Sequence, residues 1–344
     1  MITGDIIARF IKFVRAPLGL TATSIICLCK TFSIGLKVRE IKCTTARQDI
    51  GSTGGIFLRN CAVISFWCVL PVALVLTCSI PCPALAAQGH GATVSAAPGT
   101  LVRWSAPGTK RCRMNKRSWP ALEETCYYPV DLLQKPGLIK ITRWGHGPGE
   151  SAHISVEPSS YETQEIDLGD IPQANPAPKD LKRIAHERVL LNKVWKRKVG
   201  PAIFTLPLGP PASPLPEGRD FGANRVFNGK PAGQPHTGAD YATPVDTPVL
   251  AVADGKVVIA EDLFFPGNAV FIDHGDGLIS MSFHLSEIKV KAGQQVKKGD
   301  TVGLVGTTGR STGPHLFFGV RWHGARINPK FLLEDPAKIP AVGP

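Results

Sequence analysis

Three short segments of the sequence gather side chains that bind metals or transfer protons. The first, PHTGAD, places His236 four residues before Asp240. The second, MSFHLS, carries His284, and the third, GPHLFFGV, carries His315. Imidazole and carboxylate groups are common zinc ligands and common general acids or bases. Each segment alone is a weak signal, because the chain has nine histidines, but their order and their intervals of 48 and 31 residues make them a set.

Short strands must position these side chains. From Gly200 onward, Gly and Pro residues separate short apolar runs, and no long amphipathic helix lies between them. Parallel strands need such crossover helices, so we expect an antiparallel sheet in a mainly β fold. The expected strands are residues 249–252, 256–260, 269–272, 278–283, 302–305 and 316–322.

The three segments together resemble the lysostaphin/LytM-type zinc metalloendopeptidases, peptidoglycan hydrolases that cut peptide bonds in bacterial cell-wall cross-bridges. The resemblance covers about 135 residues, 200–335. In that family one zinc ion is held by the His and Asp of H-x-x-x-D and by the second His of a late H-x-H. The resemblance therefore implies that His236 and Asp240 are metal ligands. It also implies that His284 and His315 form the catalytic pair.

One position departs from the family pattern. The third metal ligand falls on Phe317, whose ring offers no donor atom to zinc. Residues i and i+2 of a strand share a face, so Phe317 is expected to project into the site beside His315. Catalytic zinc uses about three protein ligands and a water, and two ligands would hold it poorly. Either His315 turns to the metal and leaves His284 as the only base, or activity is lost. His323 is also near, but strand alternation does not fix its orientation.

Two functions follow from this reading. The first is a cell-wall metalloendopeptidase that hydrolyses the peptide cross-links of peptidoglycan with a zinc-activated water. The second is a non-catalytic module of the same fold, which binds peptidoglycan or regulates another wall hydrolase. Phe317 favours the module, whereas retention of the other four polar positions favours the enzyme. A biotinyl or lipoyl carrier is excluded, because no lysine lies in the required hairpin setting.

The beginning of the chain is typical of an exported protein. An apolar run over residues 61–80 follows Arg59 and ends at Ala84-Leu85-Ala86, which predicts a signal peptide over residues 58–87. An uncleaved membrane anchor is the alternative, because about 20 apolar residues can span a bilayer. Residues 1–57 are interpreted as an extension outside the functional protein. We expect a periplasmic or secreted protein that contacts the membrane only transiently, through this leader.

Cysteine placement and charge agree with that compartment. Seven of the nine cysteines lie before residue 83, which leaves Cys112 and Cys126. In an oxidising compartment this pair predicts one disulfide, with two free thiols as the alternative. The formal charge is +12, and residues 1–87 contribute half of it. The remaining excess suits an anionic polymer such as the cell wall and is too dispersed for nucleic acid. Nothing in the sequence indicates an oligomeric state.

Two further regions precede the peptidase-like segment. Alternating runs between Pro and Gly turns predict a small β domain over residues 88–170. Residues 171–199 form a linker followed by apolar residues at helical spacing, which predicts a connecting helix over 180–198. This helix is expected to pack on a neighbouring element. A membrane-surface role is less favoured, because Asp180 and Glu187 lie within it.

Overall fold

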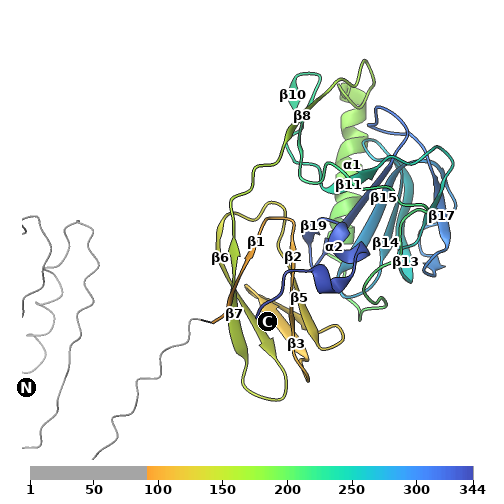
Figure 1. Cartoon of the computed structure of the whole chain (residues 1–344). Helices are drawn as coiled ribbons and strands as arrows, with labels where there is room; N and C mark the ends of the chain where they lie inside the picture. The colour runs from red at the N-terminus through yellow and green to blue at the C-terminus, as the bar shows by residue number, and fades with distance from the viewer. Residues whose placement is uncertain (1–90, 344) are drawn as a thin grey trace, which may run out of the picture. The chain divides into compact units, whose positions relative to one another are not determined.

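The computed structural model describes residues 91–343. The predicted extension (1–57) and signal peptide (58–87) lie outside these residues. Within the described part of the chain, no helix has both the length and the apolar character needed to cross a membrane. The fold is mainly β with antiparallel sheets and one long helix, as the sequence predicts (Figure 1).

The first group of strands forms a small β domain. A five-stranded sheet in the order β1-β7-β6-β3-β4 lies beside the β2-β5 pair. Alternate apolar side chains of both sheets meet in one core, which includes Val102, Tyr128 and Ile154. A disulfide joins Cys112 of β3 to Cys126 of β5 within that core. The strands are β1 (Thr93–Ala96), β2 (Leu101–Ser105), β3 (Arg111–Met114), β4 (Arg117–Pro120), β5 (Thr125–Pro129), β6 (Gly137–Trp144) and β7 (Glu150–Val156).

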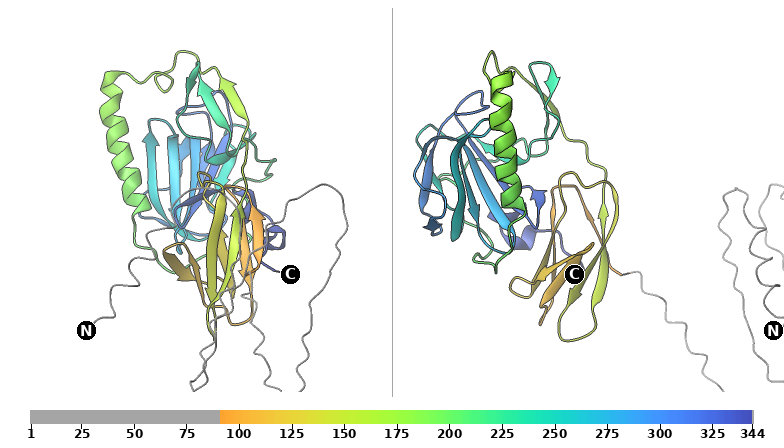
Figure 2. Two further views of the ribbon diagram at one scale, coloured as in Figure 1. Left: turned by 90° about the vertical axis from the view of Figure 1, so that its left-hand side faces the viewer. Right: turned by 180° about the vertical axis from the view of Figure 1, so that it is seen from behind.

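The connecting helix α1 spans Pro178–Trp195. Proline suits its first position because that residue needs no amide hydrogen there, and the Asp180 carboxylate accepts the Ala177 amide at 3.0 Å. Its last turns carry Leu190, Leu191 and Val194 on one side. These side chains pack on the neighbouring sheet, so the helix covers one face of it (Figures 1 and 2).

The nine-stranded sheet of the C-terminal region positions the predicted site. Its order is β11-β18-β15-β14-β13-β16, with β12, β17 and β19 added at the sides, and its strand pairs are antiparallel. The strands are β11 (Gly238–Tyr241), β12 (Pro248–Leu250), β13 (Gly255–Leu263), β14 (Gly267–Asp273), β15 (Leu278–Ile288), β16 (Gln295–Val296), β17 (Thr301–Val305), β18 (Leu316–Trp322) and β19 (Ala325–Ile327).

The alternation of side chains along β18 separates the two faces of this sheet. Leu316, Phe318 and Val320 enter the main core of the C-terminal region. Phe317 and Arg321 lie on the opposite face, where Phe317 stacks on Phe283 and Arg321 lies over a ring of α1. The site and the helix therefore share one face of the sheet.

Two long-range pairings join the regions. Strand β8 (Thr163–Ile166) lies in the range predicted for the small β domain, yet it pairs in parallel with β9 (Asn224–Phe227). Strand β10 (Lys230–Pro231) completes that three-stranded sheet. After the short helices α2 (Lys330–Leu333) and η1 (Pro336–Lys338), the chain returns to the small β domain, and Val342 enters its core.

Candidate metal centre and active site

The sheet brings the five predicted site positions together. His236 lies two residues before β11, which carries Asp240, and β11 pairs with β18 so that Asp240 lies opposite Phe317. On the other side of β18, Phe317 lies opposite Phe283 of β15, next to His284. His315 precedes β18 and forms an isolated bridge with Gly306. Segments far apart in the chain thus meet at one end of three neighbouring strands.

A β-bulge turns His284 toward the site. Opposite β14, the register passes from Ser282↔Val270 to Leu285↔Asn268, so two residues of β15 face one of β14. His284 adopts a left-handed φ of 63°, a conformation that costs a non-glycine residue about 1–3 kcal/mol. Because of this turn, Leu285 packs in the core while His284 faces the other histidines. Simple alternation along the strand would have pointed His284 to the opposite face.

All three site histidines are held in the same tautomer. Nδ1 of His236 lies 3.0 Å from the carbonyl oxygen of Asp220. Nδ1 of His284 and His315 lie 2.8 Å from the carbonyl oxygens of Thr308 and Gly313. A carbonyl only accepts, so each Nδ1 donates its hydrogen, and in the neutral form of each ring the lone pair of Nε2 is available to a metal. A histidine that ligates a metal is commonly oriented in this way by its second nitrogen.

The free lone pairs converge on one carboxylate oxygen. Oδ1 of Asp240 lies 3.3 Å from Nε2 of His236 and 3.6 Å from Nε2 of His315. The Oδ1 atom and the His236 Nε2 atom are buried, and neither has a hydrogen-bond partner in the described residues. Two buried acceptors that face each other are unfavourable unless a cation or a proton lies between them.

These separations suit a zinc ion. Ligand atoms about 2.0–2.1 Å from a tetrahedral zinc lie roughly 3.3–3.4 Å from one another. Within residues 91–343, no three His, Cys, Asp or Glu side chains already form a complete metal-binding group. His236 and Asp240 have the spacing of two ligands, and Nε2 of His315 lies slightly farther from Oδ1 than a third ligand would. The donor types therefore fit a zinc ion, and within the described residues His236 and Asp240 stand at ligand spacing without a third such side chain.

The second oxygen of Asp240 is held by an arginine that sequence reasoning missed. Arg225 of β9 donates to Oδ2 at 2.6 Å, and its guanidinium lies 3.8 Å from Asp220. Burial by itself would raise the pKa of Asp240, but its interactions with His236, Arg225 and His315 outweigh burial and hold that pKa below its usual range. Asp240 is therefore ionised, with one oxygen held by Arg225 and the other free. Nothing in the pattern around Arg225 marks it in the sequence.

Phe317 fills the floor of the site. Its ring is 5% exposed, stacks parallel to Phe283 at 4.4 Å and meets His236 edge to face at 5.1 Å. A Cβ added to Gly238 would lie 2.5 Å from this ring, so the glycine between the two ligands makes room for it. The aromatic ring thus lies at the position for which the resemblance in the sequence implies a third ligand.

His284 is poised as a neutral base. Burial, with a smaller contribution from His315, lowers the pKa of His284 to about 4, and the imidazole ring is therefore uncharged at neutral pH. The ring centres of His284 and His315 are 4.9 Å apart. A proton acceptor thus lies beside the free lone pair of His315.

Two adjoining cavities open onto the site. One of about 210 Å³ is lined by His236, His284 and Phe317, and one of about 590 Å³ by Asp240 and His315. Both are bordered by Arg310, whose guanidinium lies over the ring of Phe265 at 4.8 Å. Burial lowers the pKa of Arg310 to about 10, so it still carries a positive charge at neutral pH. Sequence reasoning did not single out this arginine either.

The two other C-terminal histidines lie away from the site. His323 pairs with Asp276 at 3.3 Å and stacks on Trp119 of the small β domain at 4.2 Å. His274 is fully buried, contacts the carbonyl of Asp254 and accepts from Ser280. Neither residue can replace the missing ligand.

Comparison of this chain with known proteins shows to which family it is similar. Residues 234–329 match the model of Peptidase family M23. The chain is also 32% identical to a putative peptidase M23 of Pseudomonas aeruginosa, with a TM-score of 0.53. That match covers 69% of this chain and 94% of the other.

This chain belongs to peptidase family M23. The resemblance predicted from the three motifs is thereby confirmed. Among characterised members, the peptidoglycan DD-endopeptidase ShyA of Vibrio cholerae is 45% identical over 94 residues, which is 27% of this chain and 22% of ShyA. The DD-carboxypeptidase/endopeptidase Mpg of Neisseria meningitidis is 46% identical over 94 residues, with the same two shares. The match to these relatives spans only about a fifth of their length.

Proposed function

We propose that this protein is a zinc-dependent endopeptidase that hydrolyses peptide cross-links of peptidoglycan. His236, Asp240 and His315 would hold one zinc ion, and His284 would act as the general base. The family and the named activities of the Vibrio and Neisseria relatives support the substrate class. Phe317 at the usual third-ligand position is the reason for assigning that role to His315.

One observation carries this proposal. Two histidine nitrogens with free lone pairs lie 3.3 and 3.6 Å from the same buried oxygen of Asp240. Burying such a group costs several kcal/mol unless a cation compensates it. A zinc ion between these groups would remove that cost.

The residues of the site divide the work of hydrolysis. A zinc ion held by these residues would lower the pKa of a water molecule and polarise the scissile carbonyl. His284 is uncharged and presents Nε2, so it can take a proton from the attacking water and return it to the leaving amine. Arg310 borders both cavities and provides positive charge for the developing oxyanion or for a substrate carboxylate.

Zinc content and peptide release test the proposal together. The purified protein should hold about one zinc ion and release peptides from purified peptidoglycan, and removal of zinc by a chelator should abolish the release. His284→Ala is the matched variant, which should keep the metal and lose at least a hundredfold in rate. A wild-type protein without zinc and without peptide release would refute the enzymatic function.

A second candidate function rests on Phe317. Its ring is packed between Phe283 and His236, where it excludes water and a third conventional ligand. A non-catalytic module that binds the wall or regulates another hydrolase would tolerate this ring. Wall binding that is unchanged in a His284→Ala/His315→Ala variant, together with no lysis by any form, would favour the module.

We also propose that the chain is exported to the periplasm or secreted. The leader over residues 58–87 would direct it there, and residues 88–170, 171–199 and 200–335 would be the successive parts of the mature protein. The disulfide between Cys112 and Cys126 supports an oxidising compartment.

A further inference from the structure

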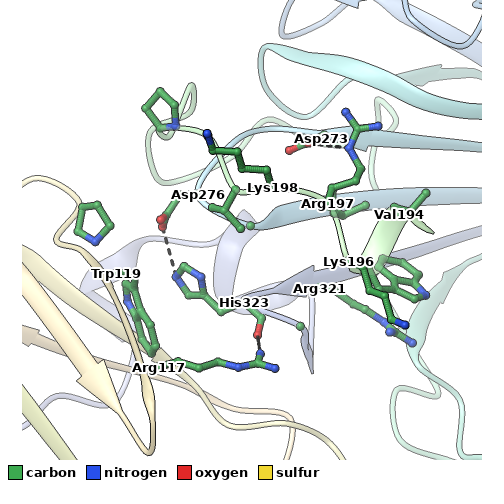
Figure 3. Close-up of a pocket in the computed structure, with 18 of the residues that line it drawn as sticks. Arg117, Trp119, Val194, Lys196, Arg197, Lys198, Asp273, Asp276, Arg321 and His323 are labelled. Carbon is green, nitrogen blue, oxygen red and sulfur yellow. Dashed lines mark hydrogen bonds and ion pairs between the residues drawn. The ribbon is translucent and has the colours of Figure 1, made fainter. Parts of the chain in front are cut away.

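A second cleft lies between the small β domain and the peptidase region (Figure 3). Its volume is about 1080 Å³, which is at the upper end for binding sites of small ligands. One wall comes from β4, with Arg117 and Trp119, and the other from the end of α1 and the residues that follow it. The floor comes from the ends of β14, β15 and β18.

Positive charge dominates this cleft. Five cations line it against two carboxylates: Arg117, Lys196, Arg197, Lys198 and Arg321 against Asp273 and Asp276. Both acids already have partners. Asp273 pairs with Arg197 at 3.5 Å, and Asp276 pairs with His323 and accepts the indole N–H of Trp322. In the described residues, the other four cations form no ion pair with a carboxylate.

Arg321 is the most informative of these cations. Its guanidinium lies over the ring of Trp195 at 4.1 Å and is only partly exposed. Burial, together with nearby Arg326, lowers its pKa to about 10, so it remains charged at neutral pH. A half-buried cation with no carboxylate partner in the described chain is costly by itself, and an anionic ligand would compensate it.

The cleft and the candidate active site share a face of the sheet. Arg321 follows Phe317 by four residues on β18, so the two side chains point the same way, about 13 Å apart along the strand. Val194 and Ile279 add apolar surface beside the cations. The cleft therefore suits a chain that alternates carboxylates with short aliphatic groups, as the stem peptides of peptidoglycan do.

We propose that this cleft binds a carboxylate-bearing stem peptide of peptidoglycan that is not the one being cleaved. The cations at the end of α1 and on β18 receive the carboxylates, and the apolar wall receives the alanine methyl groups. The cleft thus anchors the protein on the wall while the metal centre acts on a neighbouring cross-link. This inference rests on the proposed peptidoglycan substrate.

Co-sedimentation with insoluble peptidoglycan tests the anchor, with the full protein stripped of metal so that nothing is cleaved. Lys196→Gln/Lys198→Gln removes two exposed cations of the cleft. Lys179→Gln/Lys182→Gln removes two exposed lysines from the other end of α1 and is the matched control. The cleft variant should bind about five- to tenfold more weakly at low salt, whereas the control should bind as the wild type does.

Two further ligands identify what the cleft recognises. Peptidoglycan whose stem peptides have been removed by an amidase should bind the wild type as weakly as intact wall binds the cleft variant. The proposal would be overturned if the two double variants bound the wall equally. It would also be overturned if the wild type bound stripped and intact wall equally, or did not bind the wall at all. A further contradicting result would be that the wild type binds phosphatidylglycerol vesicles more strongly than it binds the wall, and that the cleft variant loses this vesicle binding.

Turnover separates this inference from the proposed function. On a small soluble cross-linked muropeptide at saturation, the cleft variant should keep the kcat of the wild type. If the wild type binds wall through the cleft but cleaves nothing, the anchor stands and the enzymatic function fails. If the cleft variant loses kcat on this soluble substrate, the cleft acts on catalysis and the anchoring role fails.

Discussion

At the scale of single residues, Phe317 and His315 are the positions on which the proposed metal site depends. Phe317 points into the site and stacks on Phe283, whereas His315 presents a free Nε2 beside Asp240. Because the resemblance implies a ligand at Phe317, we propose that His315 takes that role instead. In this proposal His284 is the one histidine that remains to accept and return protons.

Replacing the ring with a ligand should strengthen metal binding. Phe317→His places an imidazole next to His236 and Asp240, in a space that now holds a larger ring. Zinc affinity should rise at least tenfold, because three ligands would be preset and His315 would be released for catalysis. Competition with a chromogenic chelator measures the change, and Phe283→His is a control that should not raise the affinity. An unchanged affinity in Phe317→His would show that the metal does not lie beside this ring.

Arg225 should affect zinc affinity, although it contacts Asp240 and not the metal itself. Its hydrogen bond to Oδ2 of Asp240 directs the other oxygen toward the histidines. Arg225→Gln should weaken zinc binding about 10- to 100-fold, as loss of such supporting contacts commonly does. Arg219→Gln, an exposed arginine nearby in sequence, should leave the affinity unchanged. Equal zinc affinity in both variants would argue against this role.

At the scale of elements, α1 is tied to the loop that holds His284, the proposed base. Both carboxylate oxygens of Glu187 accept the amide of Phe264, at 2.9 and 3.0 Å. In the same loop, the backbone carbonyl of Phe265 accepts a hydrogen bond from the backbone amide of Arg310. The carbonyl of Pro266 accepts one from the backbone amide of His284. The strained backbone at His284 is therefore supported by a helix from outside the sheet.

Removing this tie should loosen the site. Glu187→Ala leaves the buried Phe264 amide without its acceptor, and should lower the free energy of unfolding by about 1–3 kcal/mol. Glu187→Gln keeps one acceptor oxygen and should cost less. Urea unfolding measures the stability, and kcat on a soluble muropeptide should fall more in the alanine variant. If the two variants are equally stable, the carboxylate–amide contact does not hold the loop.

The sequence predicts elements with regular patterns and misses those set by distant contacts. The strand predicted at 316–322 is found as β18 with the same bounds, because its alternation is regular. The helix begins two residues earlier than expected, at Pro178, since proline is accepted in the first turn. The bulge at His284 and the pairing of β8 with β9 could not be predicted, because both depend on partners far along the chain.

The candidate site shows the same division. The resemblance carried by the three motifs predicted which histidines and which aspartate would be near one another, and one sheet fixes all of them. Arg225 and Arg310 were missed, because an arginine has no distinctive spacing until the fold brings it to a carboxylate or an aromatic ring. The same is true of Glu187, which looked like an ordinary acid on a helix.

At the scale of the whole molecule, the small β domain is fastened to the peptidase region at several points. Asp131 receives two hydrogen bonds from the Arg326 guanidinium and one from its amide. Arg117 donates to the carbonyl of His323 at 2.8 Å, and Val342 packs into the β-domain core. The cleft of Figure 3 lies between the two regions, near these contacts. Its shape therefore depends on the contacts that hold the two regions together.

The disulfide should contribute to this rigidity. Cys112 and Cys126 are separated by 14 positions in the sequence. In the chain-entropy account, a disulfide that closes a loop of that size stabilises the folded state by about 3 kcal/mol. Cys112→Ser/Cys126→Ser should lower the free energy of unfolding by about that amount, measured in urea. Adding a reductant should destabilise the wild type and leave the double variant unaffected. A wild type whose stability does not change on reduction would contradict the prediction.

The central claim is that His315 has become a metal ligand, and the zinc content of His315→Ala tests it most directly. The wild type and His284→Ala should each hold about one zinc ion per chain, whereas His315→Ala should hold almost none after dialysis, because only His236 and Asp240 remain. If His315→Ala keeps its zinc while losing peptide release, His315 is a catalytic residue and not a ligand. That result, or a wild type that binds no zinc, would contradict the account.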